Sequence, residues 1–132
     1  MIARAGEFSL NMMARWMICA LASALWGLGG VVFAQDADTG KQAFTACAPC
    51  HAPDQNGVGP KIGGVLNRPA GSVEGFRYSR AMKNSKIVWD EKSLDAYLAE
   101  PQKLVPGNLM PFSGIADAKK RGDLIAYLGT IK

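Results

Sequence analysis

The sequence predicts an all-α fold with three to five helices and long connecting loops. No segment alternates apolar and polar residues in the period-two pattern of a half-buried strand. Residues that cap helices stand ahead of several apolar segments, and the connections between them are dense in Gly, Pro, Asn and Asp. These three observations together favour helices joined by ordered loops.

The first helix is expected to begin at Asp38 or Thr39, either of which can act as its N-cap, and to run towards Cys50. Gly40 and Phe44 are four residues apart and therefore share one helical face. Because glycine has no side chain, that face allows a second helix to approach closely.

A long loop is expected to follow the first helix and to lead into a short helical turn over 79–84. The next helix has a clear start, because Asp90 can serve as N-cap while Trp89 and Leu94 are spaced to form a hydrophobic staple. It must stop before Pro101, since the residue preceding a proline avoids the helical region.

The last helix is expected to begin near Asp117 and to end at Gly129. Three large apolar or aromatic side chains recur on one of its faces and form the stripe that a helix presents to a core. They are Leu124, Tyr127 and Leu128.

The N-terminal segment is predicted to be an export signal rather than part of the fold. Residues 16–35 carry no charge, and Ala34 places a small residue just ahead of a polar stretch, as signal peptidase requires. An uncleaved membrane anchor is the alternative, although glycines interrupt the apolar run. We therefore expect a signal peptide over 1–34 and one small domain over 35–132, placed in the periplasm and anchored to the membrane only if the segment is retained.

The charge balance argues against nucleic-acid binding. The chain of 132 residues has 15 Lys and Arg against 11 Asp and Glu, a net charge of +4, and these charges form no dense basic stripe. This mild excess is typical of a soluble protein that meets acidic partner surfaces. We expect a monomer.

The strongest motif in the chain is Cys47-Ala48-Pro49-Cys50-His51. Two thiols at this spacing can each add across a vinyl group of one haem, and the following histidine, the only one in the chain, then becomes a ligand of the iron. A redox dithiol would need a βαβ pattern, which is missing. A structural zinc site would need four ligands, and no Cys or His follows the motif.

Met110 is the predicted second ligand of the iron. It lies in a loop over 105–112 that contains two prolines and a glycine, so regular helix is ruled out and the backbone is restricted. Such a loop can hold a thioether at a fixed place. The alternative is that Met110 only fills a gap in the core. The other methionine downstream of the motif, Met82, has surroundings that look helical.

Taken together, these residues resemble a class I cytochrome c of the mitochondrial and α-proteobacterial soluble type, over residues 38–131. The resemblance implies the class I cytochrome c fold, wrapped around one covalent haem c. The pieces that match in order and spacing are Gly40, Phe44, Cys47 to His51, Gly59-Pro60, Arg68, Gly75 to Ser79, Trp89 to Leu94, Tyr97-Leu98, Val105-Pro106-Gly107, Met110 and Asp123 to Leu128.

The resemblance also implies roles around the haem that spacing alone does not show. The carbonyl of Pro60 would accept a hydrogen bond from His51, and the hydroxyl of Tyr97 would reach the sulfur of Met110. Asn108 stands where the family often has a threonine that bonds a haem propionate. Three further side chains would donate to a buried propionate: Arg68, Tyr78 and Trp89.

The function that follows is a one-electron carrier rather than an enzyme. Iron ligated by a histidine and a methionine has no open position for a substrate. The expected partners are a quinol-oxidising complex and a terminal oxidase or a periplasmic reductase or dehydrogenase. The alternative is a haem-based gas sensor or peroxidase-like protein whose methionine ligand is displaceable.

Overall fold

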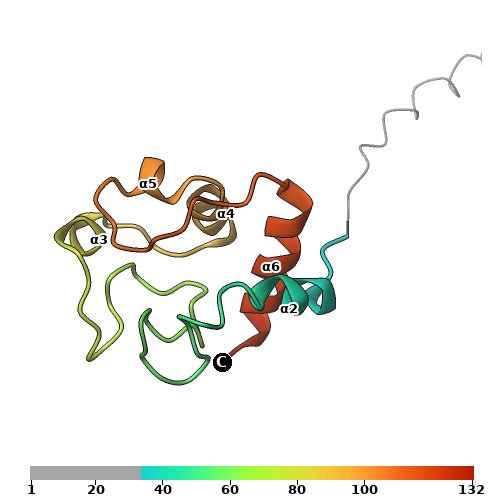
Figure 1. Cartoon of the computed structure of the whole chain (residues 1–132), viewed down its shortest axis with the longest axis horizontal. Helices are drawn as coiled ribbons and strands as arrows, with labels where there is room; N and C mark the ends of the chain where they lie inside the picture. The colour runs from blue at the N-terminus through green and yellow to red at the C-terminus, as the bar shows by residue number, and fades with distance from the viewer. Residues whose placement is uncertain (1–33) are drawn as a thin grey trace, which may run out of the picture. The chain divides into compact units, whose positions relative to one another are not determined.

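The computed structural model describes residues 34–132, which form a helical unit with long loops (Figure 1). Within this range no strand is formed, and the one β-bridge joins Pro69 and Val88. The all-α prediction is therefore confirmed. The helices are α2 (Ala37–Phe44), α3 (Arg80–Asn84), α4 (Glu91–Ala99), α5 (Pro101–Leu104) and α6 (Ala118–Thr130).

The predicted signal peptide over 1–34 falls almost wholly outside the described residues. Among the helices of residues 34–132, none combines the length and the apolar character that crossing a bilayer requires. The cleavage and anchoring alternatives both remain predictions.

Helix α2 begins earlier than predicted. Its N-cap is Asp36, whose side chain accepts hydrogen bonds from the backbone N–H groups of Asp38 and Thr39, the two residues expected to cap it. The helix ends at Phe44 and a series of tight turns replaces it up to Cys50. An N-cap must precede the first helical residue, and the backbone of Asp36 has the extended conformation that this position needs.

Helices α2 and α6 pack directly against each other (Figure 1). Gly40 is the contact point, because a Cβ atom at this position would meet the backbone of Asp123 and lie 2.8 Å from Cβ of Tyr127. The rings of Phe44 and Tyr127 pack one turn further along, with centroids 5.5 Å apart. The predicted role of Gly40 as a close-approach residue is thus confirmed.

Asp123 joins the same two helices by polar contacts. Asp123 is only 1% exposed. Its carboxylate accepts hydrogen bonds from the backbone N–H of Asp36 at 2.9 Å and from Nζ of Lys119 at 2.7 Å. The Lys119 hydrogen bond, followed by that from Asp36, holds the pKa of Asp123 below its ordinary value of 3.8.

This carboxylate is expected to make the stability of the protein depend on acid pH. A depressed pKa means that Asp123 stabilises the fold above pH 3.8 and that this contribution is lost as the pH falls through the lower pKa of the folded state. Unfolding free energies of wild type and Asp123→Asn should therefore differ most at neutral pH and converge under acid conditions. A pH-independent difference would mean that the charge of Asp123 is not what stabilises the contact.

Helix α4 has the start that the sequence predicts. Asp90 accepts a hydrogen bond from the backbone N–H of Ser93, and Ser93 Oγ accepts one from the backbone N–H of Asp90, which makes a reciprocal capping box. Trp89 and Leu94, the predicted staple, are both buried. The helix ends at Ala99, before the proline, as expected.

Helix α5 was not predicted. Its first residue is Pro101, which ends the preceding helix but suits the first position of a new one, where its fixed φ is already helical. The other predicted boundaries hold to within a residue. Ser79 caps α3 and Asp117 caps α6, while α6 continues one residue beyond Gly129 to Thr130.

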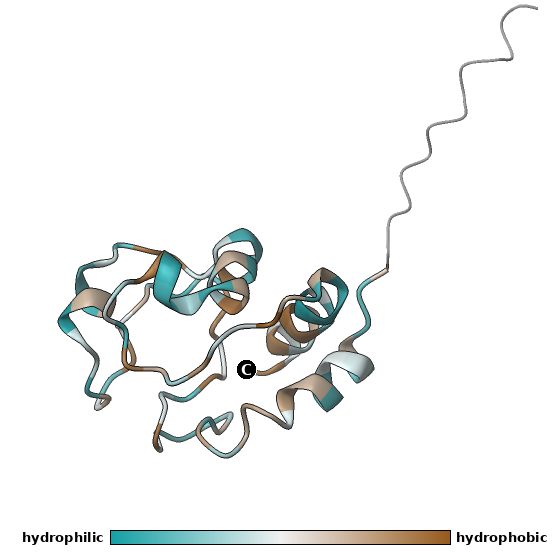
Figure 2. Ribbon diagram, turned by 45° about the horizontal axis from the view of Figure 1, so that its top comes forward, coloured by the Kyte–Doolittle hydropathy of each residue, from teal (hydrophilic) through white to brown (hydrophobic). Residues whose placement is uncertain are grey.

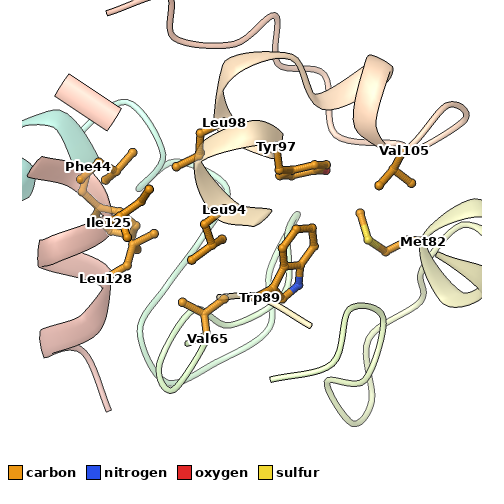
Figure 3. Close-up of a cluster of buried hydrophobic side chains, with 11 residues drawn as sticks. Phe44, Val65, Met82, Trp89, Leu94, Tyr97, Leu98, Val105, Ile125 and Leu128 are labelled. Atoms are coloured by element: carbon orange, nitrogen blue, oxygen red, sulfur yellow. The ribbon is translucent and has the colours of Figure 1, made fainter. Parts of the chain in front are cut away.

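The core runs from the α2–α6 pair through α4 to the loops beyond it (Figure 3). Helices α4 and α6 each carry hydrophilic residues on one side and hydrophobic residues on the other, as Figure 2 shows. Leu94 and Leu98 of α4 connect the two ends of the core. The buried hydrophobic side chains of this cluster are Phe44, Val65, Met82, Trp89, Leu94, Tyr97, Leu98, Val105, Leu124, Ile125 and Leu128.

Candidate haem site

The Cys-x-x-Cys-His motif follows directly after α2 and forms a tight turn. The carbonyl of Cys47 accepts hydrogen bonds from the backbone N–H groups of Cys50 at 3.0 Å and His51 at 2.9 Å. This turn brings the backbones of the three reactive residues together. Both thiols are free and half-buried, so neither is used in a disulfide.

The imidazole of His51 is oriented by the loop that follows it. Its Nδ1 lies 2.8 Å from the carbonyl oxygen of Pro60. Since a carbonyl can only accept, Nδ1 carries a proton, and in the neutral imidazole Nε2 then keeps its lone pair. This tautomer is the one that a metal-ligating histidine needs, and a carbonyl partner on the other nitrogen is the usual way to fix it.

Gly59 leaves room for the ring of His51, because it has no side chain. A Cβ atom at this position would lie 2.6 Å from Nδ1 and 2.8 Å from Nε2 of His51. The backbone N–H of Gly59 donates to the carbonyl of Cys50 at 2.8 Å, which holds the loop against the motif. The residues present therefore fit a c-type haem, since two free thiols adjoin an imidazole whose Nδ1 is held by Pro60 and whose Nε2 is left for the iron.

The thiol chemistry does not favour the redox-dithiol alternative. Burial, and after it the neighbouring Cys50, raises the pKa of the Cys47 thiol. Reactive dithiols instead depend on a lowered pKa, because the thiolate is the nucleophile. Nor do residues 34–132 contain a group of three or more His, Cys, Asp and Glu side chains that could bind a metal ion on its own.

Met110 is half-buried and packs against the hydrophobic core. Its backbone N–H donates to Oδ1 of Asn108 at 2.9 Å. The Nδ2 group of Asn108 donates to the carbonyls of Pro101 and Val105, both at 3.0 Å. Asn108 therefore links the methionine loop (105–112) to the start of α5, and its predicted contact with a propionate stays a prediction.

Gln102 adds a second link to this loop, which sequence reasoning missed. Its Nε2 donates to the carbonyl of Asn108 at 3.0 Å, and its Oε1 accepts from the backbone N–H of Gly107 at 3.3 Å. A glutamine four residues before a Pro-Gly turn is the only signal in the sequence, and it is too common to single out. The contact depends on how α5 turns back towards the loop.

The three predicted propionate donors lie in one region. Arg68 and Trp89 are paired through their backbones, with the N–H of Trp89 donating to the carbonyl of Arg68 at 3.0 Å. Burial raises the pKa of Tyr78, and the nearby charge of Arg68 acts in the opposite direction. The guanidinium of Arg68 also donates to the carbonyls of Gly63 at 2.8 Å and Lys61 at 2.9 Å. Their contact with a propionate stays a prediction.

The ring of Tyr97 packs against the ring of Trp89 in a tilted arrangement, with the two centroids 4.9 Å apart. The Tyr97 ring points towards Val105 (Figure 3). Burial raises the pKa of its hydroxyl to about 12. The hydroxyl therefore stays protonated at neutral pH and can act as a donor. The predicted hydrogen bond to the sulfur of Met110 remains to be tested.

A helical fold whose Cys-x-x-Cys-His turn presents two free thiols and an oriented imidazole defines a protein with covalently attached haem. The Cytochrome c family model matches residues 37–132. The chain belongs to this family, and it carries one haem c, attached through Cys47 and Cys50, as a one-electron carrier.

Similar proteins come from bacteria and from eukaryotes. The chain is 47% identical over 102 residues to "Cytochrome c2" of Rhodoblastus acidophilus, covering 75% of this chain and 95% of that protein. It is 45% identical over 100 residues to "Cytochrome c" of Euglena viridis, covering 74% and 98%. The solved structure of "cytochrome cH from Methylobacterium extorquens" is 47% identical with a TM-score of 0.71, and covers 72% of this chain and 98% of that one. The class I cytochrome c fold is thereby confirmed.

Proposed function

We propose that Nε2 of His51 and the sulfur of Met110 ligate the haem iron, so that the protein transfers electrons without binding a substrate. The observation that carries this proposal is the 2.8 Å contact between Nδ1 of His51 and the carbonyl of Pro60, which leaves Nε2 free to ligate. Support for Met110 comes from its half-buried position in a loop held by Asn108.

The haem, when bound, supplies an iron that holds or releases one electron. The chain determines how readily this happens. The thioether of Met110 favours the ferrous state, while the hydrogen bond from His51 to Pro60 makes the imidazole a stronger donor and favours the ferric state. The buried side chains of Trp89 and Tyr97 belong to the core against which Met110 packs, and they keep water away from it.

The proposed setting is the bacterial periplasm. Relatives in several bacteria bear the name cytochrome c2, and the N-terminal segment of this chain has the composition of an export signal. We propose that the protein takes electrons from a quinol-oxidising membrane complex. It would deliver them to a terminal oxidase or exchange them with a periplasmic reductase or dehydrogenase.

Replacing Met110 with leucine tests the ligand assignment. The ferric wild type should show the weak far-red absorption band of sulfur on iron, and Met110→Leu should lose it and show a lower reduction potential. Met82→Leu is the matched control, because Met82 is also a methionine but is buried in the core, and it should keep the band.

Carbon monoxide binding separates this reading from the sensor or peroxidase alternative. Ferrous wild type should bind it poorly, and Met110→Leu readily. Ready binding by the wild type together with a missing far-red band would instead indicate an open position on the iron, and the electron-carrier ligation would be wrong.

A further inference from the structure

We propose that Asn108 is a positioning residue that keeps the sulfur of Met110 on the iron, and that Gln102 holds Asn108 in place. This inference rests on the proposed ligation by Met110. It gives Asn108 a different task from the propionate contact implied by family resemblance.

The side chain of Asn108 connects three backbone groups, one at the start of α5 and two in the methionine loop. Nδ2 donates to the carbonyls of Pro101 and Val105, and Oδ1 accepts from the N–H of Met110. The first partner lies at the start of α5 and the last is the proposed ligand itself. The side-chain amide therefore ties the ligand to a helix rather than leaving it on an unsupported turn.

The amide of Asn108 has no hydrogen left for another partner. An asparagine side chain carries two N–H donors, and these are used by the carbonyl of Pro101 in α5 and the carbonyl of Val105 in the loop. The residue is only 5% exposed, so water cannot replace these contacts without a rearrangement. Removing the side chain would leave two carbonyls and the N–H of Met110 without this partner, which is costly in a buried place.

Gln102 extends this arrangement at the surface. Its side chain is bonded at both ends, to the carbonyl of Asn108 and to the N–H of Gly107. Gly107 has a φ of +87° and so makes the turn that leads into Asn108. Gln102 and Asn108 together link α5, the turn and Met110 in one chain of amide hydrogen bonds.

A loosened loop should raise the fraction of molecules in which sulfur is off the iron. An added ligand such as imidazole binds only that fraction, so its apparent affinity for the ferric protein measures the population directly. Losing these buried hydrogen bonds should shift this population strongly. We expect imidazole to bind Asn108→Ala about tenfold more tightly than wild type, which corresponds to about 1.4 kcal/mol.

The experiment compares holoproteins by imidazole titration, by the far-red band and by global unfolding. Asn108→Ala should bind imidazole more tightly and show a weaker band, with Gln102→Ala between it and wild type. Ile125→Val is the control, because it removes one buried methyl group in α6 and lowers stability without touching the loop. Its imidazole affinity should match that of wild type.

The inference is overturned if Asn108→Ala binds imidazole no more tightly than Ile125→Val. Should Asn108→Ala yield no folded holoprotein, Gln102→Ala decides, because its side chain is exposed and fills no part of the core. An affinity of Gln102→Ala equal to wild type would then overturn it. Met110→Leu separates this failure from failure of the ligation itself: if that variant keeps the far-red band, Met110 is not the ligand and both proposals fall.

Discussion

Replacing Gly40 with alanine should destabilise the protein by about 3 kcal/mol or more, because an added methyl group would have to enter the backbone of α6. The new Cβ atom would lie 2.5 Å from the carbonyl carbon of Asp123 and 2.8 Å from Cβ of Tyr127. Neither neighbour is the free end of a flexible side chain, so the two helices must move apart. That movement would also loosen the ring contact of Phe44 with Tyr127.

Gly122→Ala is the matched control, made on the other helix of the same pair. A Cβ atom there would meet only the side chain of Gln35, at 3.4 Å or more. Alanine favours a helix over glycine by about 1 kcal/mol, so this variant should be neutral or slightly more stable than wild type. Denaturant unfolding of the ferric proteins measures both. Equal stabilities for Gly40→Ala and Gly122→Ala would show that α2 and α6 are not in close contact at Gly40.

The helix starts that could be predicted are those set by residues close in sequence. Asp90 and Asp117 cap their helices through hydrogen bonds to backbone N–H groups two or three residues ahead. The start of α2 was placed too late. Asp36 caps it by the same kind of short-range hydrogen bonds, from the N–H groups of Asp38 and Thr39, and what sets Asp36 apart from these two candidates is the further contact of its own N–H with Asp123, which is 87 residues away in sequence. A contact of that kind leaves no local pattern.

The residues of the candidate site also fall into two groups: those whose role follows from their neighbours in sequence, and those whose role depends on contacts that the fold creates. Cys47, Cys50 and His51 are adjacent, and their chemistry is readable from their spacing. What Asn108 does could not be read from the sequence, because its partners depend on how α5 returns to the loop. Family resemblance implies a propionate contact, which stays a prediction, whereas the hydrogen bonds of the Asn108 amide in this fold go to the nearby carbonyls of Pro101 and Val105.

The second large effect is expected at Gly59, where alanine should displace the ring of His51. The new Cβ atom would lie 2.6 Å from Nδ1, the atom that donates to Pro60. The ring cannot turn away freely, since it is held by that hydrogen bond and by the motif turn. Overpacking of this kind costs about 1–3 kcal/mol of folding stability. The lost hydrogen bond should also weaken the imidazole as a donor and raise the reduction potential, by about 59 mV for each tenfold loss of preference for the ferric state.

Gly57→Ala provides the control within the same loop. Its Cβ atom would approach only the carbonyl oxygen of Cys50, at an ordinary contact distance of 3.6 Å. Potentiometric titration and denaturant unfolding of both variants separate crowding of the ring from a general effect of alanine in the loop. A raised potential and lower stability in Gly59→Ala alone would mean that the 2.8 Å contact between His51 and Pro60 sets the electron affinity of the iron. Identical potentials in the two variants would mean that the ring finds another position of equal donor strength, and the fixed orientation of His51 would then not be what tunes this carrier.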